Sequence, residues 1–402
     1  MSPDVCIYCQ VHQPYRVNRY RVFDVGSGRE YFDEARNRAI LRRVADKCYL
    51  PATRLLTEAV RRSGGRFKLA LSLSGTVLEQ LAAWAPDALD AFRELADAGA
   101  EILGETYYHS LAALTDPGEF ATQAALHRDA IARIFGRRPT VFRNTELIYD
   151  DAIGPMVRRL GYRAMLVEGA ERVLGWRSPN YVYEAASAPG LCLLPRNYRL
   201  SDDVGFRFSN RDWDGWPLTA ERWAAWIAGS GGQSAHLFLD YETFGEHQWE
   251  ETGIFEFLRH LPGELERHGL RCVTPSELAE RAPVGRLSFP TPTSWADVER
   301  DTSAWLGNRM QRAAHERLYR IGREVRALAD AARLAEWRRL TTSDHCYYMC
   351  TKWFADGDVH KYFNPYESPY DGFVAYMNVL SDLEAGLPAA APWAGVEMAV
   401  SA

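Results

Sequence analysis

Short apolar runs alternate with longer, helix-like segments over the first 240 residues of the chain. The runs are nearly continuous in hydrophobic residues, which is typical of parallel strands with both faces buried. The predicted strands are residues 5–9, 67–73, 100–103, 140–142, 164–167, 191–194 and 235–239, and the predicted helices are residues 39–62, 76–98, 120–135, 152–160 and 221–228.

Seven strands that alternate with helices fit a closed or nearly closed β/α barrel. An open, doubly wound sheet is the second interpretation of the same pattern. A sheet of that kind that binds dinucleotides carries a glycine-rich phosphate loop after its first strand, and no such loop follows residues 5–9. The barrel is therefore the favoured fold.

The pattern changes near residues 287–294, where two prolines and several hydroxyl residues indicate a boundary or a long connection. Residues 297–339 are rich in Ala, Arg, Leu and Glu and predict helices, as do residues 367–380. We therefore expect a barrel domain over residues 1–290. A mostly helical domain over residues 291–402 is expected to contribute to the substrate cleft.

Composition and charge exclude several classes of function. The chain has 402 residues, of which 47% are hydrophobic and 25% charged, and its net charge of −6 gives no basic footprint for nucleic acid. No run reaches the roughly 20 apolar residues that span a bilayer. The 7 Cys show no repeated framework, and Cys6 and Cys9 fall in a predicted buried strand. We expect free, buried thiols and a cytoplasmic protein.

Acidic residues stand where two predicted strands end. Asp240-Tyr241-Glu242-Thr243-Phe244-Gly245-Glu246-His247 follows residues 235–239, and Glu146 follows residues 140–142. Strand ends are where barrel enzymes place their catalytic groups. Carboxylates gathered at a buried strand end repel one another, so Glu242 and Glu246 are expected to raise the pKa of Asp240. Asp240 and Glu146 are the predicted pair for acid/base or nucleophilic work on one bond.

Other candidate side chains follow the first and third predicted strands. His12 and Gln13 come after residues 5–9, and the amide of Gln13 suits the binding of sugar hydroxyls. Alternation points Glu101 into the barrel interior or toward the site, with a His or Arg as its expected partner. Glu105 and His109 lie at the exit of the same strand.

A catalytic metal is a further interpretation of these residues. His12, His109, Glu146, Asp240 and His247 offer nitrogen and oxygen ligands for zinc or manganese. However, no H-E-x-x-H or H-x-H spacing is present, and we expect neither a metal nor another cofactor.

Five segments taken together resemble glycoside hydrolase family 57, whose five short conserved regions appear here in order. Each segment alone is short, but the resemblance extends over about residues 5–350. The five segments are His12-Gln13-Pro14, Gly99-Ala100-Glu101-Ile102-Leu103-Gly104, Phe142 to Leu147, Leu239 to His247 and Ser343-Asp344-His345-Cys346-Tyr347-Tyr348.

The resemblance implies a seven-stranded pseudo-TIM barrel followed by a helical domain, and retaining chemistry on α-glucans without a metal. It assigns the nucleophile to Glu146 and the general acid/base to Asp240. The form of the fifth region looks most like that of family members with α-amylase activity, which implies an α-1,4-glucan or maltooligosaccharide substrate. The residues expected to bind it are His12, Gln13, Glu101, His109, Glu242, His247, Asp344, His345 and Tyr347, with Trp249 as a further candidate.

Three alternatives remain open at this point. A 4-α-glucanotransferase or a glucan branching enzyme would use the same two carboxylates. A carbohydrate-binding or regulatory relative would keep the fold with negligible activity. A metal-dependent deacetylase or mannosidase on a related barrel is the third alternative.

Overall fold

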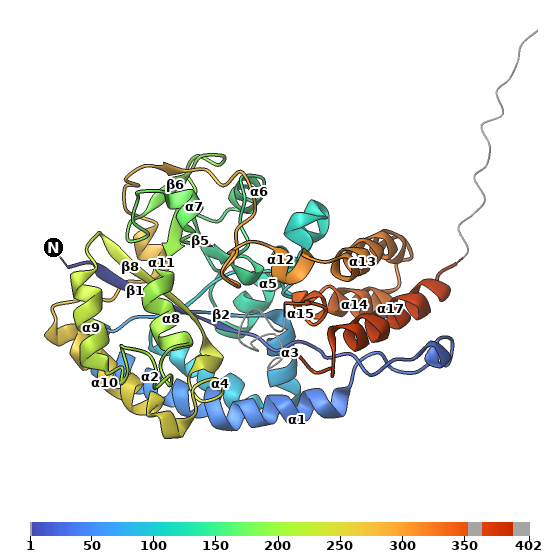
Figure 1. Cartoon of the computed structure of the whole chain (residues 1–402), viewed down its shortest axis with the longest axis horizontal. Coiled ribbons are helices and arrows are strands. Elements are labelled where there is room, and N and C mark those ends of the chain that lie inside the picture. The colour runs from blue at the N-terminus through green and yellow to red at the C-terminus, as the bar shows by residue number, and fades with distance from the viewer. Residues whose placement is uncertain (1, 353–363, 389–402) are drawn as a thin grey trace, which may run out of the picture.

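Seven parallel strands form a closed barrel in the part of the chain that the computed structural model describes, residues 2–352 and 364–388 (Figure 1). One sheet has the order β3-β2-β1-β8, and β4, β5 and β7 follow one another in the second sheet. The sheets join at Gly104, whose N–H donates to the carbonyl of Val141 at 2.9 Å, and at Asn197, whose N–H donates to His236 at 2.8 Å. The barrel strands are β1 (Asp4–Val11), β2 (Ala70–Leu73), β3 (Glu101–Ile102), β4 (Val141–Arg143), β5 (Ala164–Glu168), β7 (Cys192–Arg196) and β8 (Ser234–Asp240).

The barrel matches the seven strands expected from the sequence and excludes the open sheet. Along β1, Cys6 and Tyr8 pack inside with residues of the opposite strands, whereas Val5, Ile7 and Cys9 pack outward against helices. Both faces are therefore buried, which explains the continuous apolar runs. Cys6 and Cys9 point to opposite faces, and all seven Cys, which lie within the described residues, are buried.

Helices cover the outside of the barrel, and their boundaries follow from caps and prolines. The predicted helix at residues 39–62 begins earlier, because Asp33 caps it, and a π-helical turn at Ala45–Tyr49 divides it into α1 and α2. The predicted helix at residues 76–98 breaks at Ala85, because Pro86 begins a new helix. These helices are α1 (Glu34–Val44), α2 (Leu50–Arg62), α3 (Gly75–Trp84), α4 (Pro86–Ala98), α5 (Pro117–Phe135), α6 (Ile153–Arg159), α7 (Glu171–Leu174), α8 (Tyr198–Gly205), α9 (Ala220–Gly229), α10 (Ile254–Arg267) and α11 (Pro275–Leu278).

Two short strands that the sequence did not indicate extend the second sheet beside the barrel. β6 (Tyr183–Ala185) pairs antiparallel with β7, and β9 (Arg286–Leu287) pairs parallel with β6. Their length of two or three residues is too short for an apolar periodicity to develop. They bring the chain to the connection at which the predicted helical region begins.

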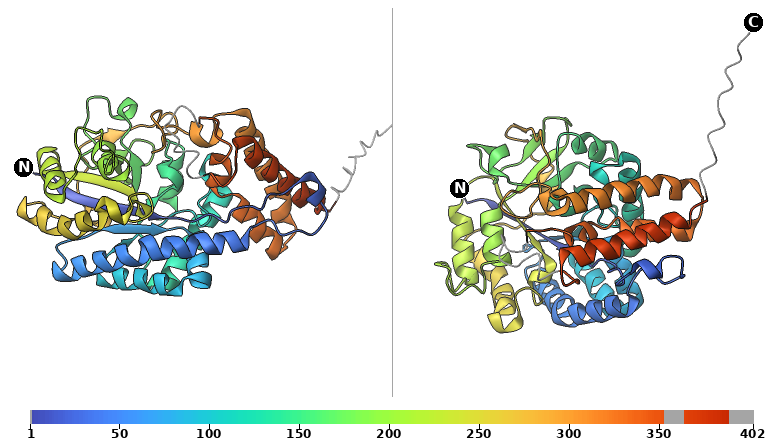
Figure 2. Two further views of the ribbon diagram at one scale, coloured as in Figure 1. Left: turned by 60° about the horizontal axis from the view of Figure 1, so that its bottom comes forward. Right: turned by 45° about the vertical axis from the view of Figure 1, so that its right-hand side comes forward.

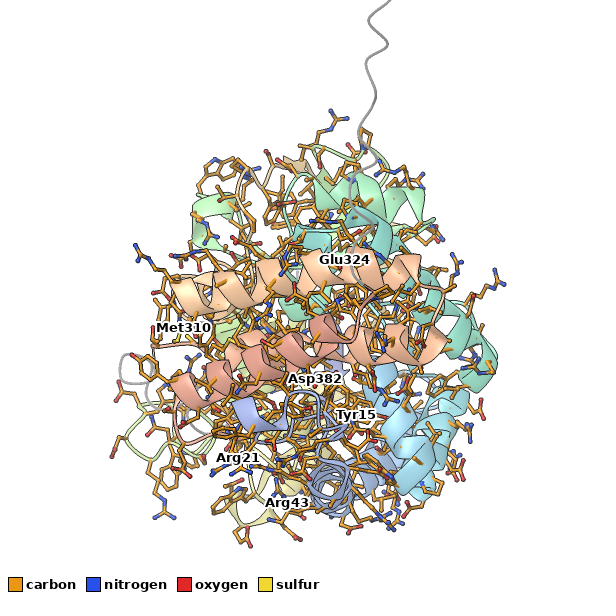
Figure 3. All side chains as sticks on the ribbon, turned by 90° about the vertical axis from the view of Figure 1, so that its right-hand side faces the viewer. Tyr15, Arg21, Arg43, Met310, Glu324 and Asp382 are labelled. Atoms are coloured by element: carbon orange, nitrogen blue, oxygen red, sulfur yellow. The ribbon has the colours of Figure 1, made fainter. Side chains whose placement is uncertain are left out.

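The helical region packs at one end of the barrel (Figure 2). Helices α13 and α17 lie side by side there, and the loop that carries Arg21 approaches α17 near Asp382 (Figure 3). The hydroxyl of Tyr31 and the N–H of Gly26 both donate to the Asp382 carboxylate. The helices are α12 (Ser303–Leu306), α13 (Arg309–Ala327), α14 (Ala331–Leu340), α15 (Ser343–Tyr347) and α17 (Pro369–Ala385).

Residues 353–363 and 389–402 of the expected helical domain lie outside the described residues. Among the helices of residues 2–352 and 364–388, none is both long and apolar enough to cross a bilayer.

Candidate active site

Glu146 lies in a short 3-10 turn, Thr145–Leu147, directly after β4. Its backbone is left-handed, with φ 57° and ψ 25°, and Leu147 follows with φ 53°. Non-glycine residues avoid this region, and each such residue costs about 1–3 kcal/mol. The surrounding contacts must therefore impose the conformation, which turns the Glu146 side chain toward the mouth of the barrel.

Two nitrogen donors fix the Glu146 carboxylate. His109 Nε2 lies 3.1 Å from Oε1, and the indole Nε1–H of Trp295 donates to Oε2 at 2.7 Å. Burial by itself would raise the pKa of Glu146, but these two contacts and the charges of His109 and Arg143 outweigh it and lower the pKa below its ordinary value. The side chain, 20% exposed, is therefore held as a carboxylate that can be reached.

His109 lies between two carboxylates. Its Nδ1 lies 3.5 Å from Oε2 of Glu105, which is completely buried, while its Nε2 contacts Glu146. Burial favours the neutral ring, but the two carboxylates prevail and raise the pKa of His109 to about 9. We infer that a positively charged imidazole stands beside Glu146 at neutral pH. Glu105 is stabilised in turn by Arg143, whose Nη1 is 4.0 Å away.

Asp240 is the last residue of β8 and is partly buried. Within residues 2–352 and 364–388, no group donates a hydrogen bond to its carboxylate. Burial is the largest influence and the charge of Glu146 the second, and together they raise the pKa of Asp240 to about 6. The two carboxyl groups are therefore electrostatically coupled, and their pKa values are shifted in opposite directions.

Glu242 and Glu246 occupy different places. Glu242 Oε1 accepts hydrogen bonds from the Tyr49 hydroxyl at 2.5 Å and from the His12 N–H at 3.3 Å. Burial and the charge of Asp240 raise the pKa of Glu242 to about 8. Glu246 instead pairs with Arg43 at 2.6 Å. Among the carboxylates, Glu146 raises the pKa of Asp240 most, and the repulsion between Glu242 and Asp240 agrees with the expectation from the sequence. The expected influence of Glu246 on Asp240 stays a prediction.

The helical region contributes Asp344 to the same cluster. His12 Nδ1 lies 2.7 Å from the Ser74 hydroxyl, and His12 Nε2 lies 3.0 Å from Asp344 Oδ2. The His12 ring stacks on His109, with centroids 4.0 Å apart. Burial raises the pKa of Asp344, but the neighbouring His12 and His109 reverse this and hold it well below its ordinary range. A chain of contacts thus joins α15 to Glu146.

The other two predicted residues of α15, Tyr347 and His345, lie on different faces of the helix. Burial raises the pKa of Tyr347, three residues after Asp344, and the charges of Asp297, Glu146 and Asp344 add to this effect. Its ring lies 6.2 Å from that of Trp305 in α12. His345 is buried on the other face and stacks on Tyr376 of α17 at 5.2 Å. Tyr347 therefore joins the cluster, whereas His345 belongs to the helical core.

Glu101 lies at the opposite end of the barrel from the two carboxylates, whereas Gln13, His247 and Trp249 lie in the loops that follow β1 and β8. Glu101 accepts a hydrogen bond from the N–H of Ser276 near the amino end of β1, so the expected His or Arg partner is wrong. Gln13 Oε1 accepts from Arg16 at 3.1 Å. His247 lies in the loop after β8, where its N–H donates to the carbonyl of Glu242. Trp249, 58% exposed, follows in that loop.

Trp295 contacts Glu146 but was not among the residues predicted from the sequence. It belongs to the irregular connection after the barrel and contacts Glu146 across 149 residues. The guanidinium carbons of Arg143 and Arg196 lie 4.7 and 5.6 Å from its ring. The only signal in the sequence is a lone Trp beside a proline-rich segment. In the described part of the chain, no three His, Cys, Asp or Glu side chains are arranged to hold a metal ion.

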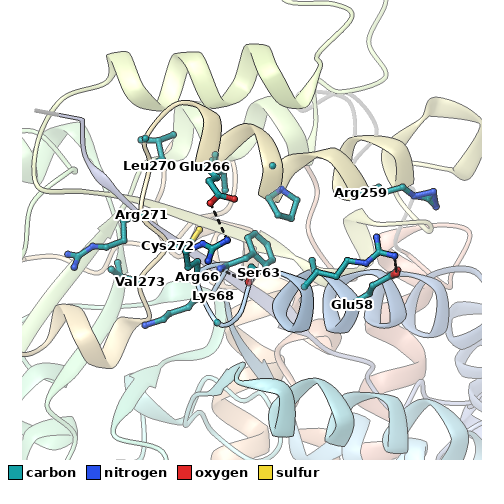
Figure 4. A pocket seen from close by; sticks show the side chains of 18 of the residues that line it. Glu58, Ser63, Arg66, Lys68, Arg259, Glu266, Leu270, Arg271, Cys272 and Val273 are labelled. Atoms are coloured by element: carbon teal, nitrogen blue, oxygen red, sulfur yellow. Dashed lines mark hydrogen bonds and ion pairs between the residues drawn. The ribbon is translucent and has the colours of Figure 1, made fainter.

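A groove of about 640 Å³ lies elsewhere, between α2 and α10 (Figure 4). Figure 4 shows charged side chains along its walls, including the ion pair of Arg66 with Glu266. Phe67 and Cys272 lie near the amino ends of the barrel strands, opposite the end that carries Glu146 and Asp240. Because barrel enzymes act at the carboxyl ends, we do not assign the reaction to this groove.

The family model described as "Glycosyl hydrolase family 57" matches residues 6–290. The protein named "Putative alpha-amylase" from Methanocaldococcus jannaschii is 43% identical over 392 residues, which cover 93% of this chain and 83% of that protein.

Solved structures show the same fold at low sequence identity. A branching enzyme of this family from Pyrococcus horikoshii is 17% identical with a TM-score of 0.69, covering 95% of this chain and 88% of that one. The 4-alpha-glucanotransferase from Thermococcus litoralis is 16% identical with a TM-score of 0.66, covering 86% of this chain. This chain spans 56% of the length of that enzyme. The chain belongs to glycosyl hydrolase family 57 and is a glycoside hydrolase.

Proposed function

We propose that this protein is a retaining glycoside hydrolase of the α-amylase type that cleaves α-1,4-linked glucans. The observation that supports this most is the opposite direction of the pKa shifts of the two carboxyl groups at the ends of β4 and β8. Glu146 is held ionised by His109 and Trp295, whereas burial raises the pKa of Asp240 to about 6. Two carboxyl groups with separated pKa values suit a nucleophile and a general acid.

In the first step, the ionised Glu146 attacks the anomeric carbon while protonated Asp240 donates its proton to the glycosidic oxygen. The bond to the leaving sugar breaks, and a covalent glycosyl-enzyme forms on Glu146. In the second step, Asp240 takes a proton from water. The water oxygen attacks the same carbon, the bond between that carbon and Glu146 breaks, and Glu146 is released as a carboxylate. Because each of the two steps inverts the carbon, the product keeps its configuration.

Binding would involve side chains from both regions of the molecule. We assign hydroxyl contacts to His12 and Asp344, because their polar atoms meet beside His109 and Glu146. Tyr347 is placed to pack against a sugar ring near the same carboxylates. The division into a barrel domain of residues 1–290 and a helical domain of residues 291–402, with the substrate between them, is part of this proposal.

The test is to incubate the protein with maltoheptaose and follow both product lengths and the anomer formed first. A hydrolase of this type releases only shorter oligosaccharides, and proton NMR shows the α-anomer before mutarotation. Products longer than maltoheptaose would instead identify a 4-α-glucanotransferase, because a sugar rather than water then accepts the glycosyl group. New α-1,6 linkages would identify a branching enzyme.

The binding-only alternative is disfavoured by the electrostatic coupling of Asp240 with Glu146. A relative without activity would have no need to keep the two carboxyl groups in one electrostatic environment, yet the charge of Glu146 raises the pKa of Asp240. Tight binding of maltoheptaose without turnover would contradict the proposal. Loss of activity with a strong chelator would favour the metal-dependent alternative.

A further inference from the structure

The connection between the barrel and the helical region, which includes Thr293 and Trp295, is held beside Glu146 by hydrogen bonds. Tyr149 and Thr293 exchange backbone hydrogen bonds of 3.2 and 2.9 Å, which attaches the connection to the loop that follows β4. Trp295 comes two residues after Thr293. Its backbone N–H donates to the carbonyl of Glu146 at 3.2 Å, and its indole N–H donates to the Glu146 carboxylate at 2.7 Å. One residue therefore holds both the strained backbone and the side chain of Glu146.

Two buried cations hold the indole itself. Arg143 is completely buried, and none of its three guanidinium nitrogens has a hydrogen-bond partner, so its close contacts are the Trp295 ring and Glu105. Arg196 is anchored by the carbonyl of Phe238 and by Asp202, and it approaches the same ring. Cation–π contacts strengthen when they are shielded from water, so the ring has little freedom to turn.

We propose that Trp295 is a positioning residue for Glu146, and that it makes the connection between the two regions part of the catalytic machinery. This rests on the proposed function in one respect, namely that Glu146 is the nucleophile. Trp295 orients Oε2 and stabilises its negative charge before attack. The carboxylate oxygen that faces His109 is fixed separately, so the two donors together leave one orientation of the carboxylate plane.

Trp295→Phe tests the proposal, because it removes the N–H and keeps an aromatic ring for Arg143 and Arg196. The expected result with maltoheptaose is a fall in kcat of roughly 10- to 100-fold with little change in KM, since a hydrogen bond to a charged group is lost. The acid limb of the pH profile should move to higher pH, because protonation of Glu146 becomes easier. An unchanged kcat and an unchanged acid limb would overturn the proposal.

Trp337→Phe is the matched control. Trp337 is also buried, donates its indole N–H to the carbonyl of Leu318 at 2.9 Å, and lies 5.3 Å from the guanidinium of Arg326. It belongs to α14, far along the chain from the two carboxylates. Its replacement should lower the melting temperature and leave the pH profile unchanged. A shift of the acid limb in Trp337→Phe equal to that in Trp295→Phe would reduce Trp295 to a structural role.

A measurement without turnover separates this proposal from the proposed function. In Glu146→Gln, the indole N–H resonance of one tryptophan should move by more than those of the other 11 of the 12 in the chain, and Trp295→Phe should remove that resonance. If no indole resonance moves, the contact is absent in solution and the positioning role fails, even when Glu146→Gln is inactive. If the resonance moves but Glu146→Gln remains active, the proposed function fails instead.

Discussion

The carboxyl groups at the ends of β4 and β8 are both partly buried, but in the part of the chain that the structure describes only the one at the end of β4 accepts hydrogen bonds. At the end of β4, a left-handed backbone brings Glu146 to His109 and Trp295, and these donors lower its pKa. At the end of β8, the backbone is extended and no donor from the described residues reaches Asp240, so burial and the neighbouring charge raise its pKa to about 6. The difference shows that hydrogen-bond donors, rather than depth, determine which carboxyl group keeps its proton.

The largest expected effect comes from removing the carboxylate at the end of β4. Glu146→Gln should reduce turnover of maltoheptaose by at least about 1000-fold, because no other group can form the covalent intermediate. Calorimetry should still detect maltoheptaose binding. Glu246→Gln is the control, since that acid pairs with Arg43, and it should retain nearly full activity. More than about 1% residual turnover in Glu146→Gln would contradict the assigned nucleophile.

Asp240→Asn should have the next largest effect, and its size should depend on the leaving group. With maltoheptaose, we expect a loss of roughly 100- to 1000-fold, because the leaving sugar then departs without a proton. With a 4-nitrophenyl maltooligoside, whose leaving group needs no proton, bond cleavage should suffer much less. Pre-steady-state release of nitrophenol measures that step. Equal losses with both substrates would argue against Asp240 as the general acid.

The pH dependence sharpens the comparison further. Because Asp240 must be protonated to donate, kcat/KM should fall about tenfold per pH unit above a pH of about 6. Because Glu146 must be ionised, the acid limb should lie below the ordinary pKa of a glutamate. Carboxyl NMR of Glu146→Gln should show a lower pKa for Asp240, since a neighbouring negative charge has been removed. An unchanged pKa would mean that the two groups are not coupled.

The smallest expected effect is a change in stability with pH that depends on Glu168, at the end of β5. It is completely buried, and although Arg196 lies 3.4 Å away, burial raises its pKa to about 7. A raised carboxyl pKa favours the folded protein below pH 4.5, and this contribution is lost as the pH rises through 7. The stability of Glu168→Gln relative to the wild type should therefore increase over that interval, by at most about 3 kcal/mol. Urea unfolding at pH 5 and pH 8 measures it, and a pH-independent difference would refute it.

The strands and the two carboxyl groups were predictable because their signals are local. Asp240 follows an apolar run directly and Glu146 follows one after three residues, so their places at strand ends can be inferred from nearby residues. Trp295 could not be found in this way, because its contact with Glu146 spans 149 residues and its own segment has no periodicity. The connection is fixed by the bridge between Tyr149 and Thr293, which no local pattern reveals.

Glu101 and His345 show what periodicity leaves undetermined. Alternation along β3 gives the face of the sheet but not the height within the barrel, and Glu101 lies at the first residue of that strand. Glu105, four residues later, has the histidine and arginine neighbours that were expected for Glu101, namely His109 and Arg143. In α15, helical spacing places Asp344 and Tyr347 on one side and His345 on the other.

The contacts of Trp295 and Asp344 with the barrel have a practical consequence. The segment that matches the family model ends at residue 290, and it contains both carboxyl groups. A polypeptide cut there would keep Glu146 and Asp240 but lose the indole on Oε2 and the carboxylate on His12. The two pieces, produced as separate chains, should then be inactive alone and regain turnover when they associate. Release of sugar from a mixture of the two pieces would therefore measure whether two proteins fused to them bind each other.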